Sequence, residues 1–460
     1  MILNLFLKNN LLMKDYNIKE TFWMNILSSF ILLVPLFLIF SIFIADLLVS
    51  LTAIIFLFIS YKKNLWSFYK SPLVKVLFIF YLYIFIRSIF SDYNLGTFNS
   101  YKIFFYFRFI LFSIALNYIY VFDKKFIKRL TLSLSIIFIS LIFDGFFQYY
   151  FKFNIINLPL GEDNRISSFF KDELVFGSYL SRFLPLLIGL LIFNFKTSKM
   201  NNLFIFVIFF LTDTVIFLSG ERAALVIVVI SSILMIILCK NLKLIRISAL
   251  IISFFLVFII AENTPYLKKR IFLIPQELLQ NTMNAFSKID NEKYEFIPNI
   301  QRQNITKQPN ETKKKYYYLE NQTIYSLLFK TSINIFNQNK FFGQGPKTFL
   351  NYCSKEEFLV RGQEIDGCST HPHNTYFQLL SETGLIGTFF VLSFFLYISF
   401  LLLRHFVFLF FRQRLINDFE LCIYILLFVN MWPFITTGNF FNNWISIIYF
   451  YPLGFILKKK

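Results

Sequence analysis

The sequence contains few charged residues and few of the residues that build metal or nucleotide sites. Only 15% of its 460 residues are Asp, Glu, Lys or Arg, whereas a soluble domain of this size carries about 25%. The four cysteines and three histidines occur at spacings that make no zinc site. No Gly-x-x-x-x-Gly-Lys loop is present to bind phosphates, and the acidic residues do not cluster as a divalent-metal site requires. These absences exclude a soluble nucleotide-binding or zinc-dependent protein.

Long apolar runs are what the sequence has in abundance. Hydrophobic residues make up 57% of the chain and aromatic residues 21%. The runs are continuous rather than alternating, which excludes a membrane β-barrel, and each is long enough to cross roughly 30 Å of hydrocarbon. We therefore expect an all-α polytopic membrane protein with about twelve transmembrane helices. The first helix is expected at 25–43, and the second is expected from a tight turn near Asp46 to residue 61. The remaining helices are expected at 74–90, 103–121, 130–150, 175–195, 203–218, 223–239, 247–262, 383–403, 420–436 and 443–457.

The distribution of basic residues predicts the topology. The net charge of +19 comes from 45 Lys and Arg against 26 Asp and Glu, and the basic residues lie in every second loop. The positive-inside rule then places both termini in the cytoplasm. The loops expected on the other side are 91–101, 152–174, 219–222, 262–374 and 437–442. The expected organisation is transmembrane helices 1–9 in residues 1–261, one large outside loop with amphipathic helices in 262–374, and helices 10–12 in 375–460.

Two of the three histidines, His371 and His373, lie where the long polar segment ends and an apolar helix begins. Thr375 and Gln378 are spaced as a capping box, with Thr375 as the N-cap. His373 would then lie just before the helix, near the positive end of its dipole, which favours the neutral imidazole that accepts a proton. The alternative is a pair of polar loop residues beside a membrane helix.

Three further elements lie in the expected outside loops. Phe341-Phe-Gly-Gln-Gly-Pro-Lys-Thr-Phe349 is a Gly-Pro turn, in which Gly343 and Gly345 would allow close backbone approach and Lys347 would meet an anion. Ser219-Gly-Glu-Arg222 places an arginine at the outer end of a membrane helix, where its alternative role is to snorkel to the interface. The third element is Arg165-Ile-Ser-Ser-Phe-Phe170, in the expected outside loop 152–174.

These elements together resemble the O-antigen ligase superfamily. The closest resemblance is His373-Asn374 followed by nine residues, Gly384, two residues and Gly387. The Phe-Gly-x-Gly-Pro-x-x-Phe and Ser-Gly-x-Arg elements are similar to the superfamily in sequence and order. In the third element Ser167-Ser168 replaces the usual Gly-Thr.

The resemblance implies a GT-C-like glycosyltransferase in the bacterial inner membrane with its active site facing the periplasm. It would move a glycan from an undecaprenyl-diphosphate donor to an acceptor hydroxyl of lipid A–core, by an inverting, metal-independent mechanism without a cofactor. An O-antigen or exopolysaccharide polymerase and a protein O-oligosaccharyltransferase of the same superfamily are alternatives. A lipid-linked glycan transporter is an alternative of another class, although such a protein is expected to have internal repeats and short loops.

Site roles follow from the resemblance together with residue chemistry. His373 is the expected catalytic base and Arg222 the expected ligand of the donor diphosphate, since a fixed guanidinium can neutralise the leaving group. Gly384 and Gly387 would form a small-residue face that lets another helix approach. The expected substrate-binding residues are Arg165, Arg182, His371, Asn374, Lys347, Gly343 and Gly345, with Arg270 and Arg302 as further helpers.

Cys353 and Cys368 are expected to form a disulfide. Both lie in the outside loop, where an oxidising compartment permits bridging, whereas Cys239 and Cys422 lie in or beside membrane helices. The bridge would connect the Gly-Pro element to the histidine stretch. The alternative is two free thiols.

Overall fold

The computed structural model describes residues 18–95, 101–171, 173–194, 198–264, 323–362 and 365–457. Within these ranges the chain is helical, and the extended backbone is limited to three isolated β-bridges. The α-helices are α2 Ile18–Phe40, α3 Ile42–Lys62, α4 Pro72–Leu95, α5 Tyr101–Phe104, α6 Phe107–Phe122, α7 Phe126–Phe151, α8 Phe176–Asn194, α9 Lys199–Leu218, α10 Arg222–Leu238, α11 Lys243–Asn263, α14 Ile324–Gln338, α15 Phe349–Cys353, α16 Thr375–Phe410, α17 Asp418–Asn430 and α18 Asn443–Ile456. Three 3₁₀ helices occur, η1 Trp66–Lys70, η2 Glu162–Asn164 and η3 Ser168–Phe170.

A helix occupies each of the twelve positions at which a span was expected. In the described part of the chain, nine segments are long and apolar enough to cross a membrane: α2, α3, α4, α5 with α6, α7, α8, α9, α11 and α16. The other three expected spans are α10, α17 and α18, with 17, 13 and 14 residues. At 1.5 Å per residue the two shortest reach only about 20 Å of a hydrocarbon core roughly 30 Å thick. An all-helical membrane fold is therefore confirmed, while the number of twelve crossings stays a prediction.

The turn between the first two helices lies at Ser41, so the expected turn near Asp46 was wrong. The Ser41 hydroxyl accepts a hydrogen bond from the amide of Ile44 at 3.3 Å, which caps the start of α3. Asp46 lies inside α3, where its carboxylate accepts from the Arg108 guanidinium of α6 at 2.8 Å. This ion pair lets a charged residue remain in an otherwise apolar helix.

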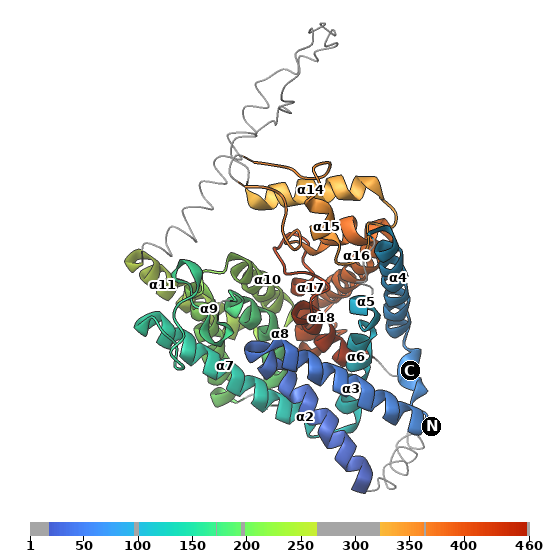
Figure 1. The fold of residues 1–460 in the computed structure, drawn as a ribbon. Coiled ribbons are helices and arrows are strands. Elements are labelled where there is room, and N and C mark those ends of the chain that lie inside the picture. The colour runs from blue at the N-terminus through green and yellow to red at the C-terminus, as the bar shows by residue number, and fades with distance from the viewer. Residues whose placement is uncertain are drawn as a thin grey trace, which may run out of the picture.

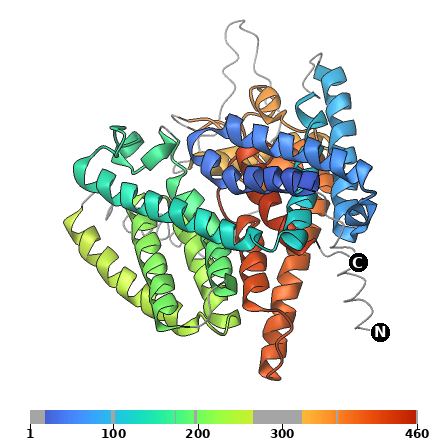
Figure 2. The same ribbon diagram turned by 90° about the horizontal axis from the view of Figure 1, so that it is seen from below.

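The centre of the molecule is formed by α8, which packs against α7, α9, α10 and α17. Nearly every side chain of α8 is buried. Figure 1 and Figure 2 show α9, α10 and α11 grouped on one side of α8, with α16, α17 and α18 on the other. Small residues bring the helices close: a Cβ at Gly189 would lie 2.8 Å from the Cβ of Cys422 in α17.

The second half of the expected outside loop folds onto one end of the bundle, where α14 and α15 lie over α16 (Figure 1). The sequence predicted α14 from apolar residues at helical spacing, and its buried face holds Leu328 and Ile335. A disulfide joins Cys353 at the end of α15 to Cys368, with the Cα atoms 5.1 Å apart, as expected from the sequence. This bridge fixes α15 beside the segment that leads to the two histidines.

Candidate functional site

The site is organised by a kink in α16 at Gly384. This residue has φ 63° and ψ −165°, which interrupts the helix. The Gly-Pro turn 341–346 packs into the interruption through backbone hydrogen bonds in both directions. The amides of Gln344 and Gly345 donate to the carbonyls of Ser381 and Glu382 at 3.0 and 2.7 Å. The amides of Leu385 and Ile386 donate to the carbonyls of Lys340 and Phe341 at 2.8 and 3.2 Å. The two elements identified separately in the sequence are therefore one structural unit.

Glycine is required at three positions of this unit. Gly343, Gly345 and Gly384 all have φ between 63° and 114°, a region that disfavours residues with a Cβ. A Cβ at Gly343 or Gly384 would lie closer than 3.0 Å to backbone atoms of the opposing segment. The expectation that Gly384 admits a helix was wrong, because it admits the turn. Gly387 does face a helix, since its Cβ would lie 3.1 Å from the ring of Tyr83 in α4.

Two side chains of α4 hold the turn in place. Arg87 donates from Nε to the Phe342 carbonyl at 3.1 Å and from Nη2 to the Gly343 carbonyl at 2.7 Å. The Tyr83 hydroxyl donates to the carbonyl of Thr383 at 2.6 Å, directly before the kink. The sequence places Arg87 inside an expected span but does not indicate its role, because its partners are backbone carbonyls, which every residue has.

The histidine stretch is fixed by Asn374, which is the N-cap of α16 in place of the expected Thr375. The Asn374 side-chain oxygen accepts from the amides of Tyr376 and Phe377 at 2.9 and 3.2 Å, and its amide nitrogen donates to the Pro433 carbonyl at 2.8 Å. Asn is as good an N-cap as Thr, and here it also anchors the loop before α18. The hydroxyl of Thr375 instead contacts the hydroxyl of Thr437 at 3.0 Å.

His371 and His373 lie side by side, with ring centroids 4.2 Å apart. Both nitrogens of His371 are engaged: Nδ1 lies 2.9 Å from the Thr370 hydroxyl, and Nε2 lies 3.3 Å from the Thr437 carbonyl. The carbonyl can only accept, so the proton of neutral His371 is on Nε2. Among the described residues the His373 ring makes no hydrogen bond, and it packs edge-on against Tyr325 of α14 at 6.0 Å.

Burial shifts the pKa of both imidazoles in the same direction. Burial and the neighbouring His373 lower the pKa of His371 to about 4, against a smaller opposing effect of the Thr437 carbonyl. Burial also lowers the pKa of His373 below its ordinary value of 6.5. Both rings are therefore neutral at pH 7, which is the form that accepts a proton.

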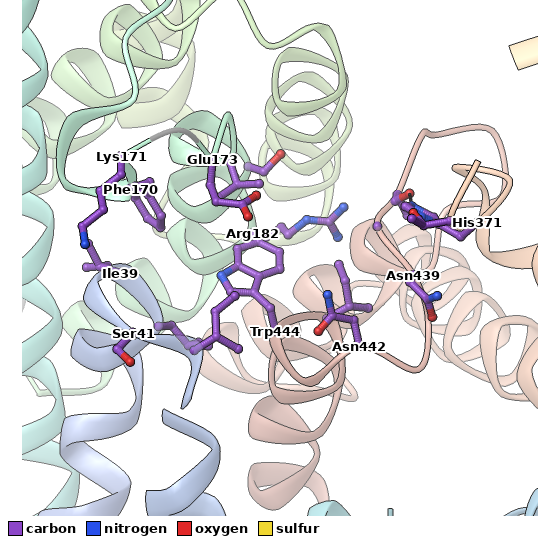
Figure 3. A pocket seen from close by; sticks show the side chains of 18 of the residues that line it. Ile39, Ser41, Phe170, Lys171, Glu173, Arg182, His371, Asn439, Asn442 and Trp444 are labelled. Atoms are coloured by element: carbon purple, nitrogen blue, oxygen red, sulfur yellow. Dashed lines mark hydrogen bonds between the residues drawn. The ribbon is translucent and has the colours of Figure 1, made fainter. Parts of the chain in front are cut away.

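A cavity of about 810 Å³ opens beside His371 (Figure 3). Its walls come from the α2–α3 turn, η3 and the start of α8, the Gly-Pro turn, the histidine stretch, and the segment 436–445 before and within α18. Four of these segments lie in loops or turns that the charge pattern assigned to one side of the membrane. Their meeting in one cavity supports the prediction that they share a side.

The cavity has both cationic and apolar lining. Of the described residues, Lys171, Arg182 and Lys347 supply its cations and Glu173 its acidic group. Its apolar lining consists of Leu38, Ile39, Phe40, Ile42, Phe169, Phe170, Val175, Trp444 and Ile445. Such a lining suits a ligand that has both an anionic group and a hydrophobic chain.

Arg182 and Lys347 have incompletely satisfied charges. The side chain of Arg182 is buried and donates to Asn430 at 2.9 Å, while its Nε has no partner in the described part of the chain. Figure 3 shows Arg182 directed toward the side of the cavity where His371 lies. Burial lowers the pKa of Lys347; the charges of Lys102 and Arg108 also lower it, whereas Glu382 and Asp46 oppose the shift. A bound anion would compensate for the burial of both cations.

Arg222 and Arg165 lie elsewhere, beside the start of α8. Arg165 donates to the Ser219 carbonyl at 3.2 Å, and Arg222 is the exposed first residue of α10. Neither belongs to the described lining of the cavity. Between them, the buried carboxylate of Glu221 accepts from the amides of Gly177 and Ser178 at 2.6 and 2.9 Å.

The structure therefore brings Arg182, Lys347 and His371 together, with His373 adjacent. Arg270 and Arg302 lie outside the described residues. Sequence analysis missed Lys171, Asn439, Asn442 and Trp444, and the only signal for the two asparagines was their position in a short loop on the expected outer side. No group of three potential metal-ligating side chains occurs in the ranges that the structure describes.

Comparison with known protein families gives a match over part of the chain. Residues 203–392 match the family model described as O-antigen ligase. The matched segment contains Arg222, the Gly-Pro turn, both histidines and Gly384 with Gly387. The comparison with curated proteins gave no match. The resemblance to the O-antigen ligase superfamily that the motifs indicated is thus confirmed.

Proposed function

We propose that this protein, with its O-antigen ligase domain at residues 203–392, transfers a glycan from a lipid-diphosphate donor to an acceptor hydroxyl. The observation that carries the proposal is the pair of neutral histidines at the edge of a cavity that is lined by both cationic and apolar side chains. Such a cavity fits a diphosphate attached to a long isoprenoid chain, and the adjacent imidazole fits a base for the acceptor.

The donor is proposed to lie in the cavity with its diphosphate between Arg182 and Lys347. The Nε of Arg182 is buried without a partner among the described residues, so the fold leaves part of this cation uncompensated. The lipid would follow the apolar lining past Ile39 and Phe170 toward the exposed ring of Phe40 at the α2–α3 turn. Undecaprenol is the lipid that the superfamily implies.

His373 is proposed as the catalytic base. The acceptor oxygen attacks the anomeric carbon while the imidazole of His373 takes the hydroxyl proton. The bond from the anomeric carbon to the diphosphate oxygen breaks, and the lipid diphosphate leaves with that electron pair, so the anomeric configuration inverts. A positioned base contributes roughly 10²–10⁴-fold to such a step. The free nitrogens of His373, set against the engaged nitrogens of His371, favour this assignment.

The roles of the arginines are revised by their positions. Arg182 is now the principal candidate for the diphosphate. Arg222, the residue favoured by the sequence motif, remains a second candidate for binding the diphosphate. It follows Glu221, whose carboxylate accepts a hydrogen bond from Ser178, and Ser178 lines the cavity. Donor-binding measurements on Arg182→Lys and Arg222→Lys separate the two: loss confined to Arg222→Lys would contradict the revised assignment.

The proposed reaction is ligation onto lipid A–core at the periplasmic face of the inner membrane. Purified protein in lipid nanodiscs would be given an undecaprenyl-diphosphate-linked glycan with lipid A–core, with a second donor molecule, or with a Ser/Thr peptide. We expect a new glycosidic bond on lipid A–core. A bond formed only with the donor glycan or the peptide would identify a polymerase or a protein glycosyltransferase. Movement of the donor across liposomes without any new bond would identify a transporter and overturn the proposal.

A further inference from the structure

A second hollow lies between α14 and the first turn of α16. It has a volume of about 400 Å³. Its floor is a parallel stack of two rings, Phe329 and Phe377, with centroids 4.3 Å apart. It is lined by Phe329, Lys330, Ile333, Asn334, Val360 and Phe377. We call it the α14 groove.

The α14 groove lies one helical turn from the contact between Tyr325 and His373. Tyr325 packs against the His373 ring, and Phe329 follows Tyr325 one turn later on the same face of α14. Phe377 follows His373 by four residues in the first turn of α16. His371 therefore faces the large cavity, whereas His373 adjoins the aromatic side chains that lead to the groove.

We propose that the α14 groove binds a pyranose ring of the acceptor and so presents the acceptor hydroxyl to His373. This assignment rests on the proposed function. A base that removes the acceptor proton must contact the acceptor, and the described lining of the donor cavity includes His371 but not His373. Phe329 and Phe377 of the α14 groove lie one helical turn from Tyr325 and His373, whose rings contact each other.

The lining of the groove has the chemistry that a sugar ring needs. Phe329 and Phe377 each cover one face of the other ring, and the remaining face of each ring carries the negative part of the aromatic quadrupole, which attracts the C–H groups on one face of a pyranose. Lys330 is exposed at the rim and offers three N–H donors to ring hydroxyls or to a phosphate substituent. Asn334 also lines the groove, and its amide donates to the Phe358 carbonyl at 3.0 Å.

The test measures KM for acceptor and donor separately in the transfer assay, with lipid A–core as acceptor. Phe329→Ala and Lys330→Ala should each raise the KM for lipid A–core by roughly three- to ten-fold, the effect of losing one stacking or one polar contact. The KM for the donor and the slow hydrolysis of donor by water should stay unchanged. Lys330 is exposed, so we expect Lys330→Ala to leave the fold of the groove intact. Ile324→Ala is the matched control, because Ile324 is an exposed residue of α14 outside the groove.

The outcomes distinguish this inference from the proposed function. Wild-type protein that transfers to no acceptor would refute the function itself. Wild-type transfer with an unchanged acceptor KM in both variants, or with equal changes in both KM values, would refute the groove assignment alone. Weakened use of a Ser/Thr peptide with unchanged use of lipid A–core would assign the groove to a polypeptide and overturn the sugar assignment.

Discussion

Substitution of Gly384 by alanine should strongly destabilise the protein, although it adds only one methyl group. Gly384 has φ 63° and ψ −165°, a combination that is essentially restricted to glycine and that costs other residues about 1–3 kcal/mol. The added Cβ would also lie closer than 3.0 Å to the carbonyl of Phe341 and the amide of Gly343. These are backbone atoms, which cannot rotate away, so the turn must move.

Movement of the turn weakens the four backbone hydrogen bonds between 340–345 and 381–386. Each contributes about 0.5–1.5 kcal/mol, and the loss of two adds about 1–3 kcal/mol to the strain. The total is about 2–6 kcal/mol. Because 1 kcal/mol shifts the melting midpoint by about 2–4 °C in a domain of 150–250 residues and by less in a longer chain, we expect a decrease of a few degrees.

The assay heats detergent-solubilised protein and follows the loss of the monodisperse size-exclusion peak. Gly438→Ala is the matched control, because Gly438 has ordinary backbone angles and its Cβ would meet nothing nearer than Ile445 at 3.3 Å. The control should melt close to the wild type. A melting midpoint of Gly384→Ala within about 1 °C of this control would refute the role assigned to the kink.

Three further predictions follow from the topology, the disulfide and the histidines. A reporter that is active only outside the cytoplasm should be active when fused near Asn310 and inactive when fused after Lys240; the reverse pattern would overturn the assigned orientation. Protein extracted without reductant should show Cys353 and Cys368 protected from alkylation, and the double serine variant should lose roughly 3 kcal/mol of stability because the bridge closes a 15-residue loop; two freely alkylated cysteines would count against the bridge. Because the base must be neutral and burial lowers the pKa of His373, transfer should be unimpaired at neutral pH and fall only below pH 6.5; a rate that increases as the pH falls through 6.5 would contradict this.

The helices and the elements of the site were predictable from the sequence because they depend on local patterns. Apolar runs marked the twelve expected helical segments, and Gly343 and Gly345 marked the turn, whereas the kink at Gly384 was not predicted. The compartment expected for the outer loop indicated the Cys353–Cys368 pair.

The assembly of the site was not predictable, because it depends on contacts between distant backbone groups. Nothing in the side chains shows that the amide of Gly345 donates to the carbonyl of Glu382, or that Arg87 binds two carbonyls of the turn. The motif therefore gave Arg222 the leading role. Among the described residues, the arginine that lines the cavity is Arg182, which is buried in the second turn of α8.

The N-cap of α16 is Asn374 and not the expected Thr375 for a similar reason. Both residues favour that position, so local propensity could not decide between them. The choice follows from the carbonyl of Pro433, to which only the Asn374 amide donates, and from the Thr437 hydroxyl, which Thr375 contacts.

The most direct test of the proposed mechanism is glycan transfer by purified, folded His373→Ala compared with His371→Ala, each with donor binding measured in parallel. We predict that His373→Ala binds donor like the wild type and loses transfer by at least about 100-fold, as expected when a general base is removed. His371→Ala should instead weaken donor binding, because His371 lines the cavity. Near-normal turnover by His373→Ala, with or without added divalent metal, would contradict the assignment of His373 as the base.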